Sequence, residues 1–431
     1  MPLAVLCAVL LTVQLSAQQL SRAERRIASA ADAGVPDAIA LLERAVNINS
    51  GSHNHDGVRA VGALFQPEFE RLGFTVRWVD GTAWGRAGHL IAEWRGNGLG
   101  PKVLFIGHLD TVFEPDSPFQ RFERLNDSTA RGPGAMDMKG GDVVMLLALR
   151  ALRETGRLDG LQITVVLIGD EEDSGRPFSV SRRDLEAAAD WADIAIGFED
   201  GDGNPATAVV GRRGYSGWTL TVTGRPAHSS QVFRPDIGYG AIYEAARILT
   251  AMQGTLAGEP NLTFNPGLIV GGTATTHDDV ESRGTAFGKA NVIAEHALVT
   301  GDLRTLSGEQ LERTRDAMRE IVVRHLPQTS AELAFVDGYP PLAPTEGNRR
   351  LLGMFDQASR DLGFGPVTAV DPARAGAADI SFVAGRVAMA LDGVGLMGDL
   401  GHTVGEVADL RTLPMQAKRV AVVLDRLARE Q

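Results

Sequence analysis

The sequence contains a single cysteine, Cys7, in a chain of 431 residues. It lies inside an apolar N-terminal stretch, residues 3–13, which is followed by the small residues Ser16 and Ala17. This pattern is typical of a signal peptide, and it predicts removal of residues 1–17 and a periplasmic or secreted protein. A mature chain without cysteine excludes disulfides, thiol catalysis and thiolate metal ligands. Any bound metal ion must therefore be held by His, Asp and Glu side chains.

The sequence also lacks a long cluster of Lys and Arg residues, and its net charge is −12. Both features argue against nucleic acid and against an anionic membrane surface as partners. The N-terminal apolar stretch is too short to span a membrane, so no stable membrane association is expected. Apolar residues make up 44% of the chain, which is ordinary for a globular protein, and the length predicts about two domains.

Buried strands alternate with helical segments through the first half of the chain. Each strand is a continuous run of Val, Ile and Leu, which is typical of an α/β sheet covered by helices on both faces. We therefore predict an α/β catalytic domain with a mixed central sheet. The expected strands include VRWVD (76–80), HLIAEW (89–94), KVLFIG (102–107), ITVVLIG (163–169) and IAIGF (194–198).

The pattern changes at Arg212, where strands with alternating polar and apolar residues begin. The order of elements from there is β-α-β-β-α-β, as in a ferredoxin-like α+β domain. After Tyr339 the chain returns to the alternation of helices and strands. The simplest organisation is a catalytic domain of residues 23–211 and 337–431, interrupted by an inserted domain of residues 212–336.

Acidic residues and histidines follow the ends of the buried strands. Ligands bind at the carboxyl ends of strands in open α/β sheets, so these side chains are expected to meet there. Carboxylates packed this closely raise one another's pKa values unless cations neutralise them. Imidazole and carboxylate ligands without sulfur suit zinc in a hydrolytic site. The residues are His108 and Asp110, the run Asp170-Glu171-Glu172, the pair Glu199-Asp200, and Asp137 in the turn GPGAMDMKGG.

These motifs resemble those of the di-zinc exopeptidases that include glutamate carboxypeptidase, aminoacylase and succinyl-diaminopimelate desuccinylase. The resemblance covers nearly the whole chain after about residue 30, in the family's order and spacing. It implies a zinc-exopeptidase-type catalytic domain with an inserted lid and dimerisation domain. The motifs are GHLDTV, GPGAMDMKGG, DEEDSG, FED and LGHTVGE, with GRPAHSS, KANVI, GDLR and AGAAD as secondary matches.

The resemblance implies two zinc ions per subunit, with Co²⁺ or Mn²⁺ as substitutes. Asp137 resembles the carboxylate that bridges both ions, and the peptide bond after it is expected to be cis. His108 and Glu199 would complete one ion's ligands, with Asp200 as the alternative to Glu199. The other ion's ligands would be completed by Glu172 and His402.

Two further acids of the motifs have expected catalytic roles in the family. Asp110 would hold the second ring nitrogen of His108 and so fix its tautomer. Glu171 would take the proton of the attacking water and pass it to the leaving amine. The resemblance therefore implies hydrolysis of a peptide or amide bond next to a free carboxylate, in a small peptide or an N-acyl amino acid.

The inserted domain would supply residues for the substrate and for a homodimer. His228 resembles the histidine that crosses the dimer interface and stabilises the oxyanion in the partner's active site. Arg304 and Asn291 resemble groups that hold the substrate's terminal carboxylate and backbone. Asp379 is a further substrate-binding candidate, although it also fits a helix cap, and Arg304 also fits a surface ion pair.

Two other functions remain open at this point. The same fold and metals would serve an N-acyl or N-succinyl amino-acid deacylase. A non-catalytic metal-dependent binding protein is the alternative from another class, and the intact Glu171 argues against it, because a binding protein has no need of an unliganded base.

Overall fold

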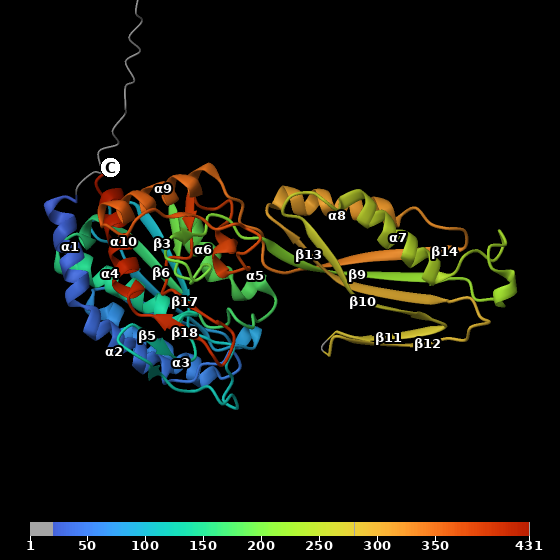
Figure 1. Ribbon diagram of the computed structural model, residues 1–431, viewed down its shortest axis with the longest axis horizontal. Helices are drawn as coiled ribbons and strands as arrows, with labels where there is room; N and C mark the ends of the chain where they lie inside the picture. The colour runs from blue at the N-terminus through green and yellow to red at the C-terminus, as the bar shows by residue number, and fades with distance from the viewer. Residues whose placement is uncertain (1–19, 280, 431) are drawn as a thin grey trace, which may run out of the picture.

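The computed structural model describes residues 20–279 and 281–430, so the predicted signal peptide lies outside these residues. Figure 1 shows a larger and a smaller lobe next to each other. The smaller lobe is formed by residues 214–337, and the larger lobe by the chain before and after them. Within the described residues, no helix has both the length and the apolar character needed to cross a membrane.

A six-stranded mixed sheet forms the centre of the larger lobe, with the strand order β1-β2-β6-β3-β7-β16. β6, β3, β7 and β16 are parallel, whereas β2 and β1 extend one edge as antiparallel strands. This confirms the predicted α/β fold with a mixed central sheet. The strands are β1 (Thr75–Asp80), β2 (Gly88–Trp94), β3 (Lys102–His108), β6 (Gln162–Ile168), β7 (Ile194–Gly197) and β16 (Met389–Leu391).

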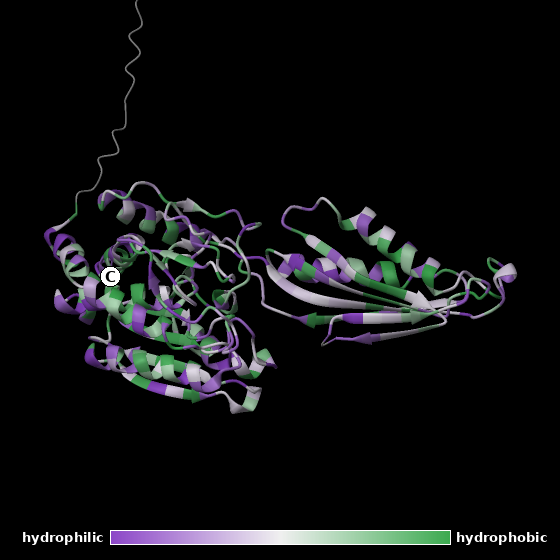
Figure 2. Ribbon diagram, turned by 60° about the horizontal axis from the view of Figure 1, so that its bottom comes forward, coloured by the Kyte–Doolittle hydropathy of each residue, from purple (hydrophilic) through white to green (hydrophobic). Residues whose placement is uncertain are grey.

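Helices cover both faces of this sheet. Alternate residues of β3 enter two different cores: Phe105 packs in the core that contains α4, whereas Leu104 and Ile106 pack in the core that contains α6. Figure 2 shows the apolar residues gathered on the central strands and on the inner sides of these helices. The helices are α1 (Arg22–Ala33), α2 (Val35–Val46), α3 (His55–Arg71), α4 (Lys139–Glu154), α5 (Phe178–Ser181), α6 (Arg183–Trp191), α9 (Glu346–Asp361) and α10 (Thr412–Leu427).

Short strands join distant segments of the larger lobe. A small sheet has the order β17-β18-β5-β4, and β8 pairs with β15. The pairing of β18 with β5 brings the loop that carries His402 next to the turn that carries Asp137. These strands are β4 (Glu123–Arg124), β5 (Thr129–Arg131), β8 (Thr207–Ala208), β15 (Thr368–Ala369), β17 (Gly398–Asp399) and β18 (Val407–Asp409).

The smaller lobe is an antiparallel sheet with the order β10-β13-β9-β14 and helices on one face. Its four strands and two helices occur in the predicted order β-α-β-β-α-β. An additional hairpin, β11–β12, was not expected from the sequence, and Figure 1 shows it on the face opposite the helices. The elements are β9 (Gly214–Gly224), α7 (Ala241–Leu256), β10 (Thr263–Gly272), β11 (Ala274–Asp278), β12 (Arg283–Phe287), β13 (His296–Thr305), α8 (Gly308–Val322) and β14 (Thr329–Asp337).

Candidate metal centre

The carboxyl ends of three neighbouring parallel strands bring the expected ligands together. β3 ends at His108, β6 is followed by Glu172, and β7 is followed by Glu199. Since these strands lie side by side, their ends meet at one edge of the sheet. Asp137 reaches the same place from the turn before α4, and His402 from the loop between β17 and β18.

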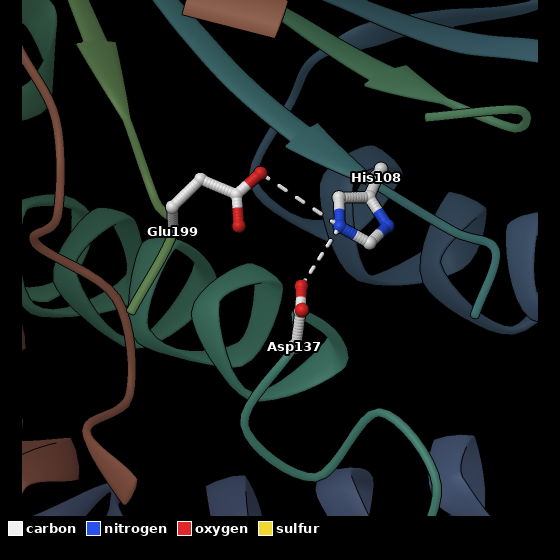
Figure 3. Close-up of side chains that lie close together, drawn as sticks. All are labelled: His108, Asp137 and Glu199. Atoms are coloured by element: carbon white, nitrogen blue, oxygen red, sulfur yellow. Dashed lines mark hydrogen bonds and ion pairs between the residues drawn. The ribbon is translucent and has the colours of Figure 1, made fainter. Parts of the chain in front are cut away.

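His108, Asp137 and Glu199 form one group of three candidate ligands. The Nε2 atom of His108 lies 3.1 Å from Oδ1 of Asp137 and 3.7 Å from Oε1 of Glu199. Figure 3 shows all three side chains pointing toward one another from β3, from the turn before α4 and from the end of β7. Asp200, the alternative to Glu199, belongs to neither of the groups found among the described residues.

Asp137, Glu172 and His402 form a second group of candidate ligands. The Nε2 atom of His402 lies 2.9 Å from Oδ2 of Asp137 and 3.1 Å from Oε2 of Glu172. The two oxygens of Asp137 therefore face different groups, Oδ1 toward His108 and Oδ2 toward His402. One carboxylate shared in this way is the arrangement that the motif resemblance implies for two metal ions.

The spacing of the donor atoms fits zinc. Metal–ligand bonds of 2.0–2.1 Å in a tetrahedral zinc site place neighbouring ligand atoms about 3.3 Å apart. The four distances between donor atoms run from 2.9 to 3.7 Å. Imidazole nitrogens and carboxylate oxygens are also the donor set expected when sulfur is lacking. Each group thus offers three ligand atoms and leaves a fourth position for water or substrate.

The crowding of buried acids in the cluster favours a bound cation. Burial, together with nearby Asp137 and Glu171, raises the pKa of Glu199 well above its usual value. Hydrogen bonds with Asp137 and Glu172 raise the pKa of His402 to about 11. Without a bound cation, this environment favours the protonated form of Glu199 and the charged form of His402. Metal binding releases such protons and replaces their charge.

Asp110 holds the strand ends in place. Its Oδ1 lies 3.4 Å from Nδ1 of His108, and its backbone carbonyl lies 3.1 Å from the same nitrogen. Oδ1 also accepts the backbone N–H of Glu171, and Oδ2 accepts the N–H of Glu172 and the hydroxyl of Ser52. The fully buried carboxylate therefore orients one imidazole and fixes the loop that carries the candidate base.

The glycine-rich turn before α4 is compact because its neighbours leave no room for side chains. Gly134 has a φ of +74°, a backbone conformation that glycine adopts without penalty. A Cβ atom on Gly141 would lie 2.0 Å from the carbonyl oxygen of Phe198, so α4 packs directly against the end of β7. The peptide bond between Asp137 and Met138 is cis, as the resemblance implies.

Glu171 belongs to neither of the two groups, although it directly precedes Glu172 of the second group. It lines a small enclosed cavity at the strand ends together with His108, Glu199 and Asp379. Burial raises the pKa of Glu171 well above its usual value, and Asp379 and Glu172 add to this effect. A carboxyl with a raised pKa beside the candidate metal position can accept and return a proton.

Asp379 borders the same cavity, and only one of its two carboxylate oxygens has a hydrogen-bond partner among the described residues, since Oδ2 is buried without one. Its Oδ1 accepts a hydrogen bond of 2.7 Å from Nε of Arg182, and both side chains are buried. Arg182 also forms an ion pair with Asp170. The structure thus places Asp379 in a buried network beneath the centre, and its predicted contact with substrate stays a prediction.

The candidate substrate-binding residues of the inserted domain lie at two opposite ends of the smaller lobe. Strand register places Arg304 opposite Tyr215, near the larger lobe, whereas His296 at the start of β13 pairs with Thr223 at the other end of β9. His228 and Asn291 lie together at that other end, where the N–H of Ser229 donates to the carbonyl of Asn291. An eleven-residue strand spans about 35 Å, so Arg304 and His228 of one chain cannot meet at one substrate.

Three buried charged residues around the centre, Glu406, Asp392 and Arg182, were not predicted from the sequence. The carboxylate of Glu406 accepts the N–H groups of Gly134, Met136 and Asp137. Asp392 accepts the N–H of Glu199 and forms an ion pair of 2.7 Å with Arg212. An acid inside an apolar run, as in VAMALDGVG, is a local signal of a buried charge, but its partner lies far away in the sequence.

The chain is similar in sequence to known proteins over most of its length. Residues 104–426 match the family described as peptidase family M20/M25/M40. The chain is 26% identical to carboxypeptidase G2 of Pseudomonas sp. (strain RS-16) over 386 residues, 88% of this chain and 86% of the relative. It is also 26% identical to succinyl-diaminopimelate desuccinylase of Acidiphilium cryptum (strain JF-5), over 91% of this chain and 99% of the relative.

Solved structures share the fold at lower sequence identity. Aminopeptidase PepT of Bacillus cereus superposes with a TM-score of 0.70 at 19% identity, over 91% of this chain and 99% of that chain. The YXEP protein of Bacillus subtilis, described as a dinuclear metal binding peptidase, gives a TM-score of 0.63 at 14% identity, over 93% of this chain and 99% of that chain. These similarities support the two-lobed architecture.

Proposed function

This chain belongs to the peptidase family M20/M25/M40, and on that basis we propose that it is a zinc-dependent exopeptidase that releases a C-terminal amino acid from a small peptide. Membership makes it a hydrolase of peptide or amide bonds. The observation that carries the finer proposal is the pair of ligand groups sharing Asp137, with the carboxyl of Glu171 free beside them. A binding protein would have no use for this extra acid.

The residues around the centre would have different roles in hydrolysis. His108 and Glu199 would hold one zinc ion, Glu172 and His402 the other, and Asp137 both. When bound, the metal pair supplies Lewis-acid polarisation of the scissile carbonyl and lowers the pKa of water.

Glu171 would perform the proton transfers. It takes a proton from the attacking water as the C–O bond forms, and it gives that proton to the amine as the C–N bond breaks. Asp110 keeps Glu171 in place through its backbone N–H.

The smaller lobe would complete the substrate site. Arg304, near the larger lobe, is suited to a terminal carboxylate because a guanidinium binds both oxygens. It now pairs with Asp302 at 2.8 Å and is partly exposed, so a substrate carboxylate can compete for it. His228, at the far end, would stabilise the oxyanion in the partner of a homodimer.

An exposed apolar patch on the smaller lobe supports the homodimer. We define this patch by Phe233, Ile242, Tyr243 and Ile269, each at least half exposed. Phe233, from the segment before α7, packs against Tyr243 on α7. Ile269 lies on the edge strand β10, whose outer backbone groups are open to pairing. A second copy related by two-fold symmetry would cover both the patch and the strand edge.

The apolar N-terminal stretch supports export of the protein. N-terminal sequencing of protein from the periplasm or medium should find a mature chain that begins near Gln18.

The proposed activity is tested with a substrate panel that contains dipeptides and N-acyl or N-succinyl amino acids. The zinc-loaded chain should release free amino acids from the dipeptides, identified by mass. Preference for the acylated substrates would instead identify a deacylase, which the similarity to the desuccinylase favours. Metal binding without any hydrolysis would identify a binding protein.

The matched variant for this test is Glu171→Gln, which removes the base and keeps the shape of the side chain. It should retain two metal ions and lose about three orders of magnitude in kcat, within the range of general-base effects. Asp173→Asn, an exposed acid of the same loop, serves as the control and should stay near wild-type. Loss of metal together with activity would make Glu171 a ligand and not the base.

A further inference from the structure

The two segments that join the lobes are bonded to each other. Arg212 in the entering segment exchanges both backbone hydrogen bonds with Leu342 in the returning one, at 2.9 and 3.0 Å. Three residues further into the smaller lobe, the N–H of Tyr215 donates to the carbonyl of Tyr339 at 3.0 Å. The rings of Tyr215 and Tyr339 also stack, with centroids 5.9 Å apart and an interplanar angle of 19°. We call these two bonded segments, residues 212–215 and 339–342, the hinge ribbon.

Tyr339 anchors this hinge ribbon in the larger lobe. Its side chain is 5% exposed and packs edge-on between the rings of Phe178 and Phe382, at 5.4 and 5.1 Å. Its hydroxyl donates a hydrogen bond of 3.1 Å to the backbone carbonyl of Glu171. A residue of the hinge thus touches the peptide of the candidate base directly.

Arg182 and Ser174 complete the environment of the Tyr339 hydroxyl. The Nη2 atom of Arg182 lies 3.2 Å from the hydroxyl and 2.9 Å from the hydroxyl oxygen of Ser174. The two hydroxyl oxygens are 2.8 Å apart. Since Arg182 can only donate, the phenol oxygen accepts from it, and its own proton is available to the carbonyl of Glu171. The same carbonyl also accepts from the hydroxyl of Ser174 at 3.2 Å, so Tyr339 and Ser174 hold it together.

Glu171 is consequently held from two sides. Its N–H donates to Asp110, which belongs to the metal centre, and its carbonyl accepts from Tyr339, which belongs to the hinge. Arg176, five residues further along, also donates to the backbone carbonyl of Asp337 at the end of β14. The loop that carries Glu171 is thus bonded to Tyr339 and to Asp337, the two residues where the chain returns from the smaller lobe.

We propose that Tyr339 is a positioning residue that couples the orientation of the smaller lobe to the placement of the Glu171 carboxyl. This inference rests on the proposed function of Glu171 as the base. The hydroxyl of Tyr339 does not touch substrate, and it acts through the peptide of Glu171. The base therefore reaches its working position only when the hinge ribbon holds that peptide.

The test compares Tyr339→Phe with Tyr215→Phe. The first variant removes the hydrogen bond to Glu171 and keeps the stacked rings. The second variant removes the hydroxyl of Tyr215 and keeps the hydrogen bond of Tyr339 with Glu171. We expect kcat to fall about tenfold for Tyr339→Phe, as befits one lost hydrogen bond, while KM stays within about twofold. Tyr215→Phe should keep the wild-type kcat.

A second readout needs neither metal nor substrate. In the metal-free chain, amide hydrogen exchange of peptides covering residues 169–176 should be several-fold faster in Tyr339→Phe than in Tyr215→Phe. Wild-type kcat and unchanged exchange in Tyr339→Phe would overturn the inference, and so would equal losses in both variants. If the wild-type chain hydrolyses no substrate of the panel, the proposed function fails, and the exchange measurement still decides whether Tyr339 holds this loop.

Discussion

Glu406 determines how Asp137 is presented to the two ligand groups. Its carboxylate is 1% exposed and accepts the N–H groups of Gly134, Met136 and Asp137 at 2.9 to 3.3 Å. Burial raises the pKa of Glu406 to about 7, and nearby Asp137 adds to the shift. Three converging N–H groups satisfy this acid, and it in turn fixes the turn from which Asp137 projects.

We predict that Glu406→Gln weakens metal binding by about 10–100-fold, the usual cost of losing a residue that orients a ligand. The amide has the shape of the carboxyl, but its NH₂ group faces a backbone N–H and cannot accept from it. Competition with a chelator measures the affinity. Asp409→Asn on β18, which removes the charge of an acid paired with Arg411 at the surface, is the control. Equal affinities in the two variants would contradict a role for Glu406 in presenting Asp137.

The candidate ligands were predictable because each lies in a short motif of the family resemblance. Three of these motifs follow strands of the central sheet, whereas Asp137 lies in the turn before α4 and His402 in the loop between β17 and β18. Sequence analysis did not find Glu406, Arg182 or Asp392, although all three are buried charges. Their partners lie 180 or more residues away in several cases, as for Arg212 and Asp392. Charge compensation of this kind depends on how distant segments pack, and no local spacing records it.

At the scale of elements, an ion-pair network joins the first and last helices of the larger lobe. Glu24 on α1 is 3% exposed and lies 2.8 Å from Nε of Arg426 on α10 and 2.8 Å from Nη2 of Arg429. It also caps α1, where Ser21 and Glu24 exchange hydrogen bonds. Burial alone would raise the pKa of Glu24, but the hydrogen bonds from Arg426 and Ser21 hold it at about 2.

This depressed pKa predicts how Glu24 contributes to stability. A carboxyl with a pKa of about 2 when folded and 4.5 when unfolded stabilises the fold above pH 4.5, and the contribution is lost as the pH falls toward 2. Glu24→Gln should therefore lower the free energy of unfolding by about 2 kcal/mol at pH 7, and the difference from wild-type should shrink below pH 4.5. Urea unfolding at several pH values measures it.

The exposed Glu43 on α2 offers the control for this prediction. Glu43→Gln should change the free energy of unfolding by less than about 0.5 kcal/mol, as for most surface substitutions. A pH-independent loss in Glu24→Gln would mean that the capping hydrogen bonds of α1 matter and the ion pairs with α10 do not.

The elements of the larger sheet were predictable because their strands are continuous apolar runs. The hairpin β11–β12 was not, since its strands ATTHD and RGTAF contain one large apolar residue, Phe287, which is 60% exposed. Without a buried face, alternation of polar and apolar residues is too weak to mark a strand. The hairpin is recognised only in the structure, from the pairing of its two strands and from its packing on β10. In that contact, Gly284 lies against the side chain of Val270.

At the scale of the whole molecule, the smaller lobe carries functional candidates at both ends. Arg304 lies at the end near the larger lobe, and His228 lies exposed at the far end. The imidazole of His228 contacts only its own loop in the described structure, where Nδ1 lies 2.8 Å from the hydroxyl of Ser230. The length of β9 prevents both from serving one site of the same chain, so Arg304 should act within its chain and His228 in the partner.

We predict that two inactive chains restore activity when they pair. In a heterodimer of His228→Ala and Glu171→Gln, isolated through two different affinity tags, one site has an intact Glu171 and receives His228 from the partner. This heterodimer should show roughly half of the wild-type activity per dimer, because one of its two sites is complete. Pairing Glu171→Gln with Arg304→Ala should restore no activity, since the site with the intact base lacks its own arginine. Equal activities of the two heterodimers would contradict this prediction, because His228 and Arg304 would then both act in their own chain or both in the partner.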